Sequence, residues 1–286
     1  MRIPISQRIP AFILFAALTA ALACGGEEPA APAGESGAPG ATPAESPATS
    51  DSAAASLPTA PPADLDQGLV FAISTFDRVD GKPVPKSELL TLTRSGGAWQ
   101  ATSVEDPASN VFHKAMAYTP PGAEPAIMTL GGMAAAVKLW RAGAGGLEPV
   151  QTLWEKDFGG KFSRMRDAEV ADLYGDGMPA IAVATHDQGV FAVIRPAADG
   201  SFAVEELDQE PDTFIHEIEI GDLDGDGVLE VYATPSEPNK LDGKPQPGKV
   251  VRYVPGAGEG RTVVADLGMR HAKEIYVGDV DGDGTD

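Results

Sequence analysis

Acidic side chains alternate along one short stretch of the sequence. Asp222, Asp224 and Asp226 occupy positions one, three and five of a nine-residue loop, and Glu230 occupies position nine. The glycines between and after the aspartates permit tight backbone turns. These carboxylates can converge with the carbonyl oxygen of Val228 on one cation. Oxygen ligands without nitrogen or sulfur suit Ca²⁺, which accepts about six to eight oxygens, whereas Mg²⁺ demands stricter geometry.

The loop recurs along the chain with different completeness. The copy that begins at Asp279 matches positions one, three and five, and its ninth position would be residue 287. The copy that begins at Asp172 has Tyr174 at position three and Ala180 at position nine instead of carboxylates, so we expect a weak or empty site there. A degenerate copy that begins at Tyr118 has lost its carboxylates and should bind no metal. The matching carboxylates are Asp279, Asp281 and Asp283 in the first copy, and Asp172 and Asp176 in the second.

The expected role of the metal is structural. The start of the loop resembles an EF-hand, but an EF-hand needs an acidic residue at position twelve and a helix on each side. Position twelve is Ala233, inside a strand-like run. Crowded carboxylates repel one another without a cation. The sequence therefore predicts calcium that rigidifies two strands rather than calcium that performs chemistry.

The elements around the loops repeat as well. The first loop positions fall at 118, 172, 222 and 279, which are 54, 50 and 57 residues apart. Alternating apolar residues precede and follow each loop, and a hairpin with a glycine-rich turn completes each unit. Four strands in about 50 residues are the blade of a β-propeller. A β-sandwich is the rival all-β fold, but the regular repeat favours the propeller.

The loop and its spacing resemble the FG-GAP or VCBS repeats of integrin-α-like propellers, over about residues 110–286. The resemblance implies calcium loops between blade strands and, in a complete ring, seven blades. Residues 64–286 would form the blades. Because the chain stops inside the motif at Asp279, we expect a truncated product. The rival is a small closed ring completed by the strand 69–73.

The N-terminal segment predicts export. Arg2 and Arg8 precede the apolar run 11–23, which is too short to span a bilayer and fits a signal peptide over residues 1–23. Leu22-Ala23-Cys24-Gly25 resembles the cleavage box of bacterial lipoproteins, so Cys24 would carry the lipid. An ordinary signal peptide with a chance cysteine is the rival reading. Residues 24–63, rich in Ala, Pro, Gly and Ser, would be a disordered spacer.

Charge excludes one class of partner. The chain carries a net charge of −21, which repels the phosphates of nucleic acid. We expect a protein of the bacterial cell envelope, anchored to the outer membrane or cell surface through its lipid, whose partner is an unidentified protein or glycan.

A ring of polar residues is the candidate ligand site. Basic residues stand six positions before the three acidic loops and acidic residues five positions before, which would place both signs at one mouth of the propeller channel. Solvated strand ends are the alternative interpretation. The ring consists of Arg166, Asp167, His216, Glu217, Lys273 and Glu274.

No catalytic constellation stands out. The four histidines show no zinc spacing, and we assign no catalytic residue. Two functions remain open. The first is a calcium-binding propeller that acts as a binding or scaffold module. The second is an enzyme, lyase or hydrolase-like, that acts on an extracellular polysaccharide at the channel mouth.

Overall fold

The computed structural model describes residues 3–4, 67–159, 162–237, 246–284 and 286. Their secondary structure is almost wholly strand, with one short 3₁₀ turn, η3 (Pro255–Ala257), and no α-helix among them. None of the described residues forms a helix that is long and apolar enough to cross a membrane. Residues 68–92 and 101–286 form one compact unit. The other unit includes the short strand β1 (Ile3–Pro4) and the turn region 93–100.

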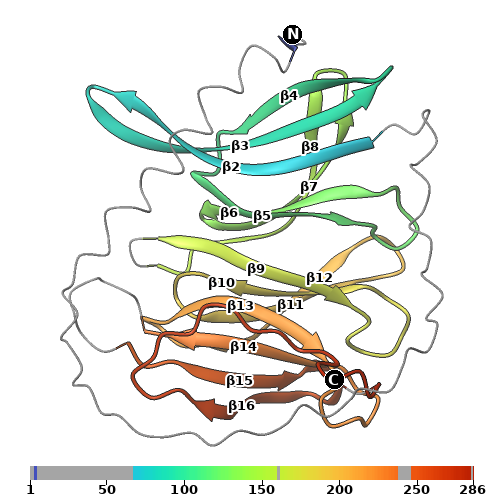
Figure 1. Cartoon of the computed structure of the whole chain (residues 1–286), viewed down its shortest axis with the longest axis vertical. Coiled ribbons are helices and arrows are strands. Elements are labelled where there is room, and N and C mark those ends of the chain that lie inside the picture. The colour runs from blue at the N-terminus through green and yellow to red at the C-terminus, as the bar shows by residue number, and fades with distance from the viewer. Residues whose placement is uncertain (1–2, 5–66, 160–161, 238–245, 285) are drawn as a thin grey trace, which may run out of the picture. The chain divides into compact units, whose positions relative to one another are not determined.

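The strands follow the chain in groups (Figure 1). The first group is β2 (Gln67–Val79), β3 (Lys82–Ser95) and β4 (Ala98–Asp106). The second is β5 (Val111–Tyr118), β6 (Ala126–Met133), β7 (Ala135–Gly143) and β8 (Gly146–Lys156). The third is β9 (Ser163–Ala171), β10 (Ala180–Thr185), β11 (Val190–Pro196) and β12 (Phe202–Gln209). The fourth is β13 (Phe214–Gly221), β14 (Glu230–Ser236), β15 (Lys249–Val254) and β16 (Glu259–Asp266).

Each of the last three groups consists of four antiparallel strands paired in sequence order, which we call a blade; β5–β12 together form one eight-stranded sheet, and β13–β16 form a separate four-stranded sheet. A short pairing of Gly132 with Arg164 and of Met133 with Ser163 joins the β5–β8 blade to the β9–β12 blade. Successive four-stranded sheets are the arrangement of a propeller rather than of a sandwich. The prediction of an all-β, propeller-type fold is therefore confirmed. The acidic loops at Asp172 and Asp222 connect the first and second strands of their blades.

The β9–β12 blade is buried on both faces. Along β10, Ile181 and Val183 face the core shared with the β5–β8 blade, whereas Ala182 faces the core shared with the β13–β16 blade. Alternate side chains of one strand thus pack into two different hydrophobic cores. This explains why β10 and β11 are nearly continuous apolar runs. In the second core Phe191 stacks on Tyr253, with 4.1 Å between ring centroids.

The first strands of the blades, β5, β9 and β13, are neighbours that side chains connect. Lys114 in β5 forms an ion pair with Asp167 in β9 at 2.7 Å. The second oxygen of the Asp167 carboxylate accepts the backbone N–H of Ile218 in β13 at 2.9 Å. Arg166 donates to the backbone carbonyl of His216 at 3.2 Å. We call β5, β9 and β13 the inner strands; the acidic loops follow the ends of β9 and β13, and the predicted polar ring lies near their starts.

Candidate functional site

The three acidic loops share one backbone conformation. The first aspartate of each accepts two backbone N–H groups, four and five residues further on. The distances are 3.0 and 2.8 Å for Asp172, 3.0 and 2.8 Å for Asp222, and 3.1 and 2.8 Å for Asp279. Gly225 and Gly227 have φ angles of +71° and +86°, a region that glycine enters at little cost. The repeated pattern of aspartates and glycines therefore produces the same turn in each loop.

In two of these loops three carboxylates converge. Within each loop, one carboxylate oxygen from each of the three aspartates lies within 4.8 Å of the others, and these aspartates are exposed or half-buried. The loops are those that the sequence predicts as calcium sites. Convergent carboxylate oxygens are the donor set that a hard cation prefers, so the residues fit calcium. The two triads are Asp222, Asp224 and Asp226, and Asp279, Asp281 and Asp283.

Glu230, the predicted ninth-position ligand, lies apart from its triad. The residue is 1% exposed, and its carboxylate accepts the hydroxyl of Tyr232 at 2.5 Å and the N–H of Leu223 at 3.0 Å. Arg252 reaches the other oxygen at 3.0 Å and lies 3.5 Å from Asp224. Glu230 therefore ties the loop to β14, and the Arg252 guanidinium supplies positive charge beside it. Val228 donates its N–H to Asp226 at 2.8 Å.

In the loop at Asp172, the positive charge beside the carboxylates comes from an arginine side chain. Arg195 in β11 forms an ion pair with Asp176 at 2.6 Å and lies 4.1 Å from the ring centre of Tyr174. This guanidinium holds the pKa of the Asp176 carboxyl below its ordinary value. Tyr174 stands where the other loops have an aspartate, and its ring packs on the arginine. In this loop an internal guanidinium supplies the positive charge beside the carboxylates.

The predicted polar ring lies in two groups. In the first, Arg166 contacts His216, and the charge of Lys273 acts on the same imidazole. In the second, burial together with the charges of Asp167 and Glu274 raises the pKa of Glu217 to about 7. Arg166 and Lys273 thus act on His216, whereas the carboxylates of Asp167 and Glu274 act on Glu217.

Sequence spacing missed one feature at this end of the inner strands. All four histidines of the chain lie in a row of edge-to-face ring contacts, with centroid distances of 5.5, 5.0 and 4.9 Å. Each comes from a different element: β5, the turn after β10, β13, and the segment after β16. We call this set, His113, His186, His216 and His271, the histidine row.

A positional signal for part of the row exists. His113 stands five residues before Tyr118, the position that Asp167 and Glu217 occupy before their own loops. Aligning the degenerate repeat would therefore have brought His113 to the polar ring. His186 follows β10 and has no counterpart in such an alignment, so its place is a result of the fold.

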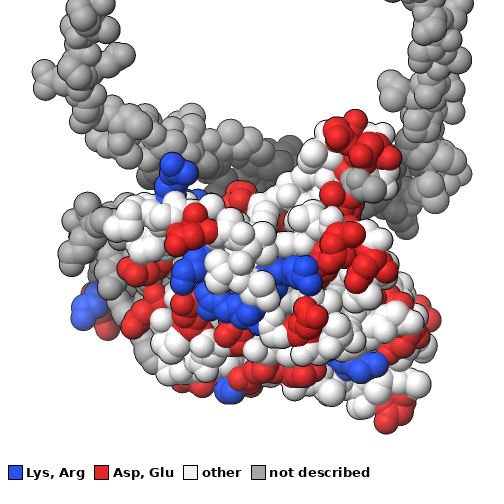
Figure 2. Space-filling model, turned by 90° about the horizontal axis from the view of Figure 1, so that it is seen from below, with Lys and Arg blue, Asp and Glu red and all other residues white. Residues whose placement is uncertain are grey.

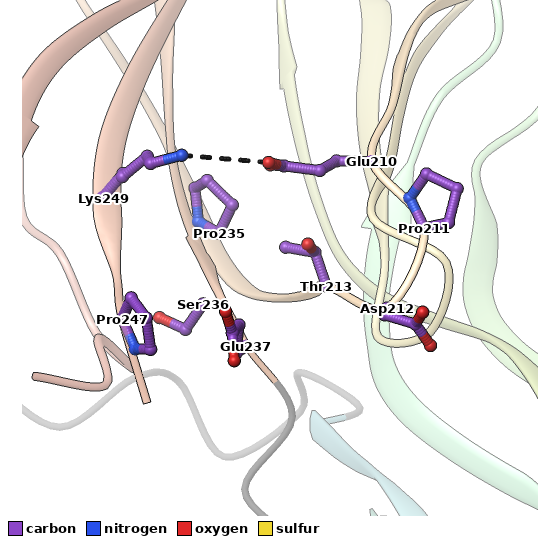
Figure 3. Close-up of a pocket in the computed structure, with 9 residues that line it drawn as sticks. All are labelled: Glu210, Pro211, Asp212, Thr213, Pro235, Ser236, Glu237, Pro247 and Lys249. Carbon is purple, nitrogen blue, oxygen red and sulfur yellow. Dashed lines mark ion pairs between the residues drawn. The ribbon is translucent and has the colours of Figure 1, made fainter. Parts of the chain in front are cut away.

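A separate pocket of about 420 Å³ opens between two blades (Figure 3). Lys249 in β15 lies 3.8 Å from Glu210, beyond the end of β12, and this ion pair crosses the pocket. Asp212 and Glu237 add negative charge to the wall. Prolines form much of the remaining lining: Pro211, Pro235 and Pro247.

The surface charge follows the composition. Figure 2 shows acidic side chains spread over the face in view, with basic side chains in smaller groups among them. The chain has 42 acidic and 21 basic residues. The signal peptide, Cys24 and the spacer lie outside the described residues, apart from the two residues of β1.

The fold and the repeated loop define a propeller-type repeat protein. Residues 172–233, which run from the first residue of one acidic loop to the middle of β14, match the FG-GAP-like repeat. This match confirms the resemblance to FG-GAP repeats. No curated protein matches the chain. The repeat and the propeller-like fold suggest a binding or scaffold module.

Proposed function

We propose that this protein is an exported, lipid-anchored binding or scaffold module for a protein or glycan, in which calcium rigidifies the propeller blades. The observation that carries the calcium part is the convergence of three aspartates in each of two loops that share one turn geometry. A binding role is supported by the FG-GAP-like repeat and by the polar and imidazole side chains gathered at the starts of the inner strands.

Calcium would be held by the carboxylates of the two triads, and in the first loop also by the carbonyl of Val228. When bound, the cation neutralises the mutual repulsion of the carboxylates. The loop with Asp222, Asp224 and Asp226 joins β13 to β14, so a cation held there also limits movement between those two strands. Glu230, whose carboxylate pairs with Arg252 and accepts from Tyr232, would support the loop from β14 beside the cation.

Calcium titration calorimetry on the folded chain tests this proposal. We expect binding with Kd of about 10⁻⁴ to 10⁻³ M, as for extracellular modules. Asp224→Asn should remove the binding heat of the first loop and Asp281→Asn that of the second. Asp199→Asn is the matched control, because Asp199 lies in a glycine turn without a triad and accepts from Ser201. Equal heats for all three variants would contradict the calcium sites.

The anchor is a separate part of the proposal, and it depends on the cleavage box at Cys24. Stable anchoring needs more than one acyl chain. Mass spectrometry of the mature protein should find Cys24 as an acylated N-terminal residue, and fractionation should recover the protein with membranes. Cys24→Ser should release it into the soluble fraction. An unmodified Cys24 in the native protein would refute lipid anchoring.

An enzyme acting on an extracellular polysaccharide is the second candidate. The observation that favours it is Glu217, whose pKa is raised to about 7 near the histidine row, a value suited to proton transfer near neutral pH. Incubation with acidic and neutral polysaccharides, followed by analysis of chain length, tests it. Cleavage that Glu217→Gln abolishes would establish the enzyme. Unchanged chain lengths across the panel would leave the binding module as the function.

A further inference from the structure

The histidine row contains every imidazole of the chain, although its members come from four elements. His186 is central: its ring lies 5.5 Å from that of His113 and 5.0 Å from that of His216, between centroids. Phe214 packs on His186 at 4.3 Å. Such edge-to-face packing holds the rings in fixed orientations, so their nitrogens form a preorganised polar surface.

Arg166 determines which ring nitrogen of His113 carries the proton. Its guanidinium lies 3.4 Å from Nδ1 of His113 and donates to the carbonyl of His216 at 3.2 Å. A guanidinium has donors and no acceptor, so Nδ1 of His113 must accept. The neutral His113 ring therefore carries its proton on Nε2 and offers an N–H donor. Burial and then the charge of Arg166 lower the pKa of His113 to about 3.

Arg166 also carries charge that no carboxylate neutralises directly. Arg164 is paired with Asp187 at 2.7 Å, whereas Arg166 forms no ion pair with any residue that the structure describes. Carboxylates do lie nearby. Asp187, which pairs with Arg164, lies 3.3 Å from Nδ1 of His186, and burial raises the pKa of the Glu217 carboxyl to about 7. The row therefore places a guanidinium without an ion pair beside two imidazoles, those of His113 and His216, whose pKa values burial lowers.

Three buried nitrogen atoms of the row, Nδ1 of His216 and both ring nitrogens of His271, lack a hydrogen-bond partner within the described part of the chain. Nδ1 of His216 is buried and makes no hydrogen bond within the described part of the chain, and the residue is 9% exposed. A buried polar atom without a partner costs free energy. A ligand that exchanges a hydrogen bond with this nitrogen removes that cost.

The donor set fits an oxyanion better than a metal ion. A metal-ligating histidine directs its other ring N–H to an acceptor, but His113 has a guanidinium donor at that position. Among the described residues, three possible metal ligands converge in the two aspartate triads and not in the row. Fixed N–H donors beside a guanidinium are the groups that bind carboxylate, sulfate or phosphate.

We propose that the histidine row and Arg166 bind an oxyanion group of a ligand, a carboxylate, sulfate or phosphate. This proposal rests on the binding function proposed above and names the chemistry of its ligand. On a chain with a net charge of −21, binding would depend on these local donors and not on the overall field.

Imidazole NMR of the folded, calcium-loaded chain tests the proposal, because every histidine signal reports on the row. The probes are sodium galacturonate, sodium sulfate and sodium phosphate, each against chloride at equal ionic strength. We expect saturable shifts of imidazole signals with at least one probe. Tighter binding of galacturonate would indicate a carboxylate ligand, and tighter binding of sulfate or phosphate would indicate those groups.

Two variants and one control keep the result specific. Arg166→Gln should weaken binding by about tenfold or more, the size expected for a lost charged hydrogen bond. Lys273→Gln, on an exposed residue, should weaken it less and tests the site if the first variant does not fold. Arg78→Gln changes an exposed arginine whose hydrogen bond goes to the nearby turn carbonyl of Gly81 and should change nothing.

Several results would overturn the oxyanion site. They are the absence of saturable shifts with all three probes, equal affinity in Arg166→Gln, and a response to Zn²⁺ without a response to any anion. In the same samples the backbone amides of Gly225 and Gly282 report calcium binding. Calcium shifts there without imidazole shifts would refute the oxyanion site alone, whereas loss of the calcium shifts would refute the calcium part of the proposed function.

Discussion

Acidification from pH 7 to pH 5 should destabilise the protein through the histidine row. Burial, with the neighbouring His186 and Arg166, lowers the pKa of His216 from 6.5 to about 3 in the folded protein. A folded pKa below the unfolded value means that this contribution is fully present above pH 6.5 and is lost as the pH falls toward 3. At pH 5 the unfolded ring is protonated and the folded ring stays neutral.

The size of this loss follows from the two pKa values. At pH 5 protonation stabilises an unfolded histidine with pKa 6.5 by about 2 kcal/mol. The folded ring stays neutral and gains no such stabilisation. The figure holds whether the folded pKa is 3 or 4, because the ring is neutral at pH 5 in both cases. Since His216 is 9% exposed, little screening by solvent applies. The raised pKa of Glu217 acts in the opposite direction, and its partial exposure reduces its effect to about 1 kcal/mol.

The test compares the parent with His216→Phe, which keeps an aromatic ring and removes the titration. Urea unfolding is followed by tryptophan fluorescence at pH 7 and pH 5, in a piperazine buffer free of phosphate and carboxylate. Between the two pH values the variant should lose about 2 kcal/mol less stability than the parent. Glu217 is common to both proteins and cancels. Equal losses in parent and variant would refute the conclusion that His216 is buried and neutral.

Three further outcomes are expected. Phe191→Ala should lower the free energy of unfolding by about 3–5 kcal/mol, because the buried ring stacks on Tyr253; urea unfolding measures it, and a loss below about 1 kcal/mol would contradict the shared core. Calcium at ten times its Kd should stabilise the folded state by about 1.4 kcal/mol per site, seen in thermal unfolding with and without chelator and reduced in Asp224→Asn. Arg195→Met should return the pKa of Asp176 toward its ordinary value, which carboxyl NMR titration can follow; an unchanged pKa would exclude the ion pair as its cause.

The acidic loops could be predicted from sequence because their geometry is local. Asp222 binds backbone groups four and five residues away, so the order of aspartates and glycines contains the whole turn. The blades were predictable for a similar reason, since each strand pairs with its neighbour in sequence. Glu230 shows the limit of this reasoning. Its spacing suits a ligand, but its carboxylate meets Arg252 of β15, and only the pairing of β14 with β15 brings the two together.

The histidine row was beyond local reasoning. Its members meet because inner strands of successive blades lie side by side, and no fixed spacing relates a strand residue such as His113 to a turn residue such as His186. The pairing of Arg195 with Asp176 is of the same kind: a hairpin strand supplies the partner of a loop residue. Contacts of this kind depend on the register of the strands, which hydrophobic alternation alone does not define to the residue.

His216 of the row and the first aspartate triad lie at opposite ends of β13, and this limits how the two candidate sites can communicate. His216 and Asp222 are six residues apart along β13 and its loop, which corresponds to about 20 Å of extended chain. That distance exceeds the screening length of about 8–10 Å at physiological salt, so the charge of a bound calcium ion acts weakly on the imidazoles. Calcium would therefore influence oxyanion binding through the rigidity of the blades. If so, Asp224→Asn should leave the imidazole pKa values unchanged and should broaden the imidazole signals when calcium is present. A shift of those pKa values on calcium binding would instead show direct electrostatic coupling.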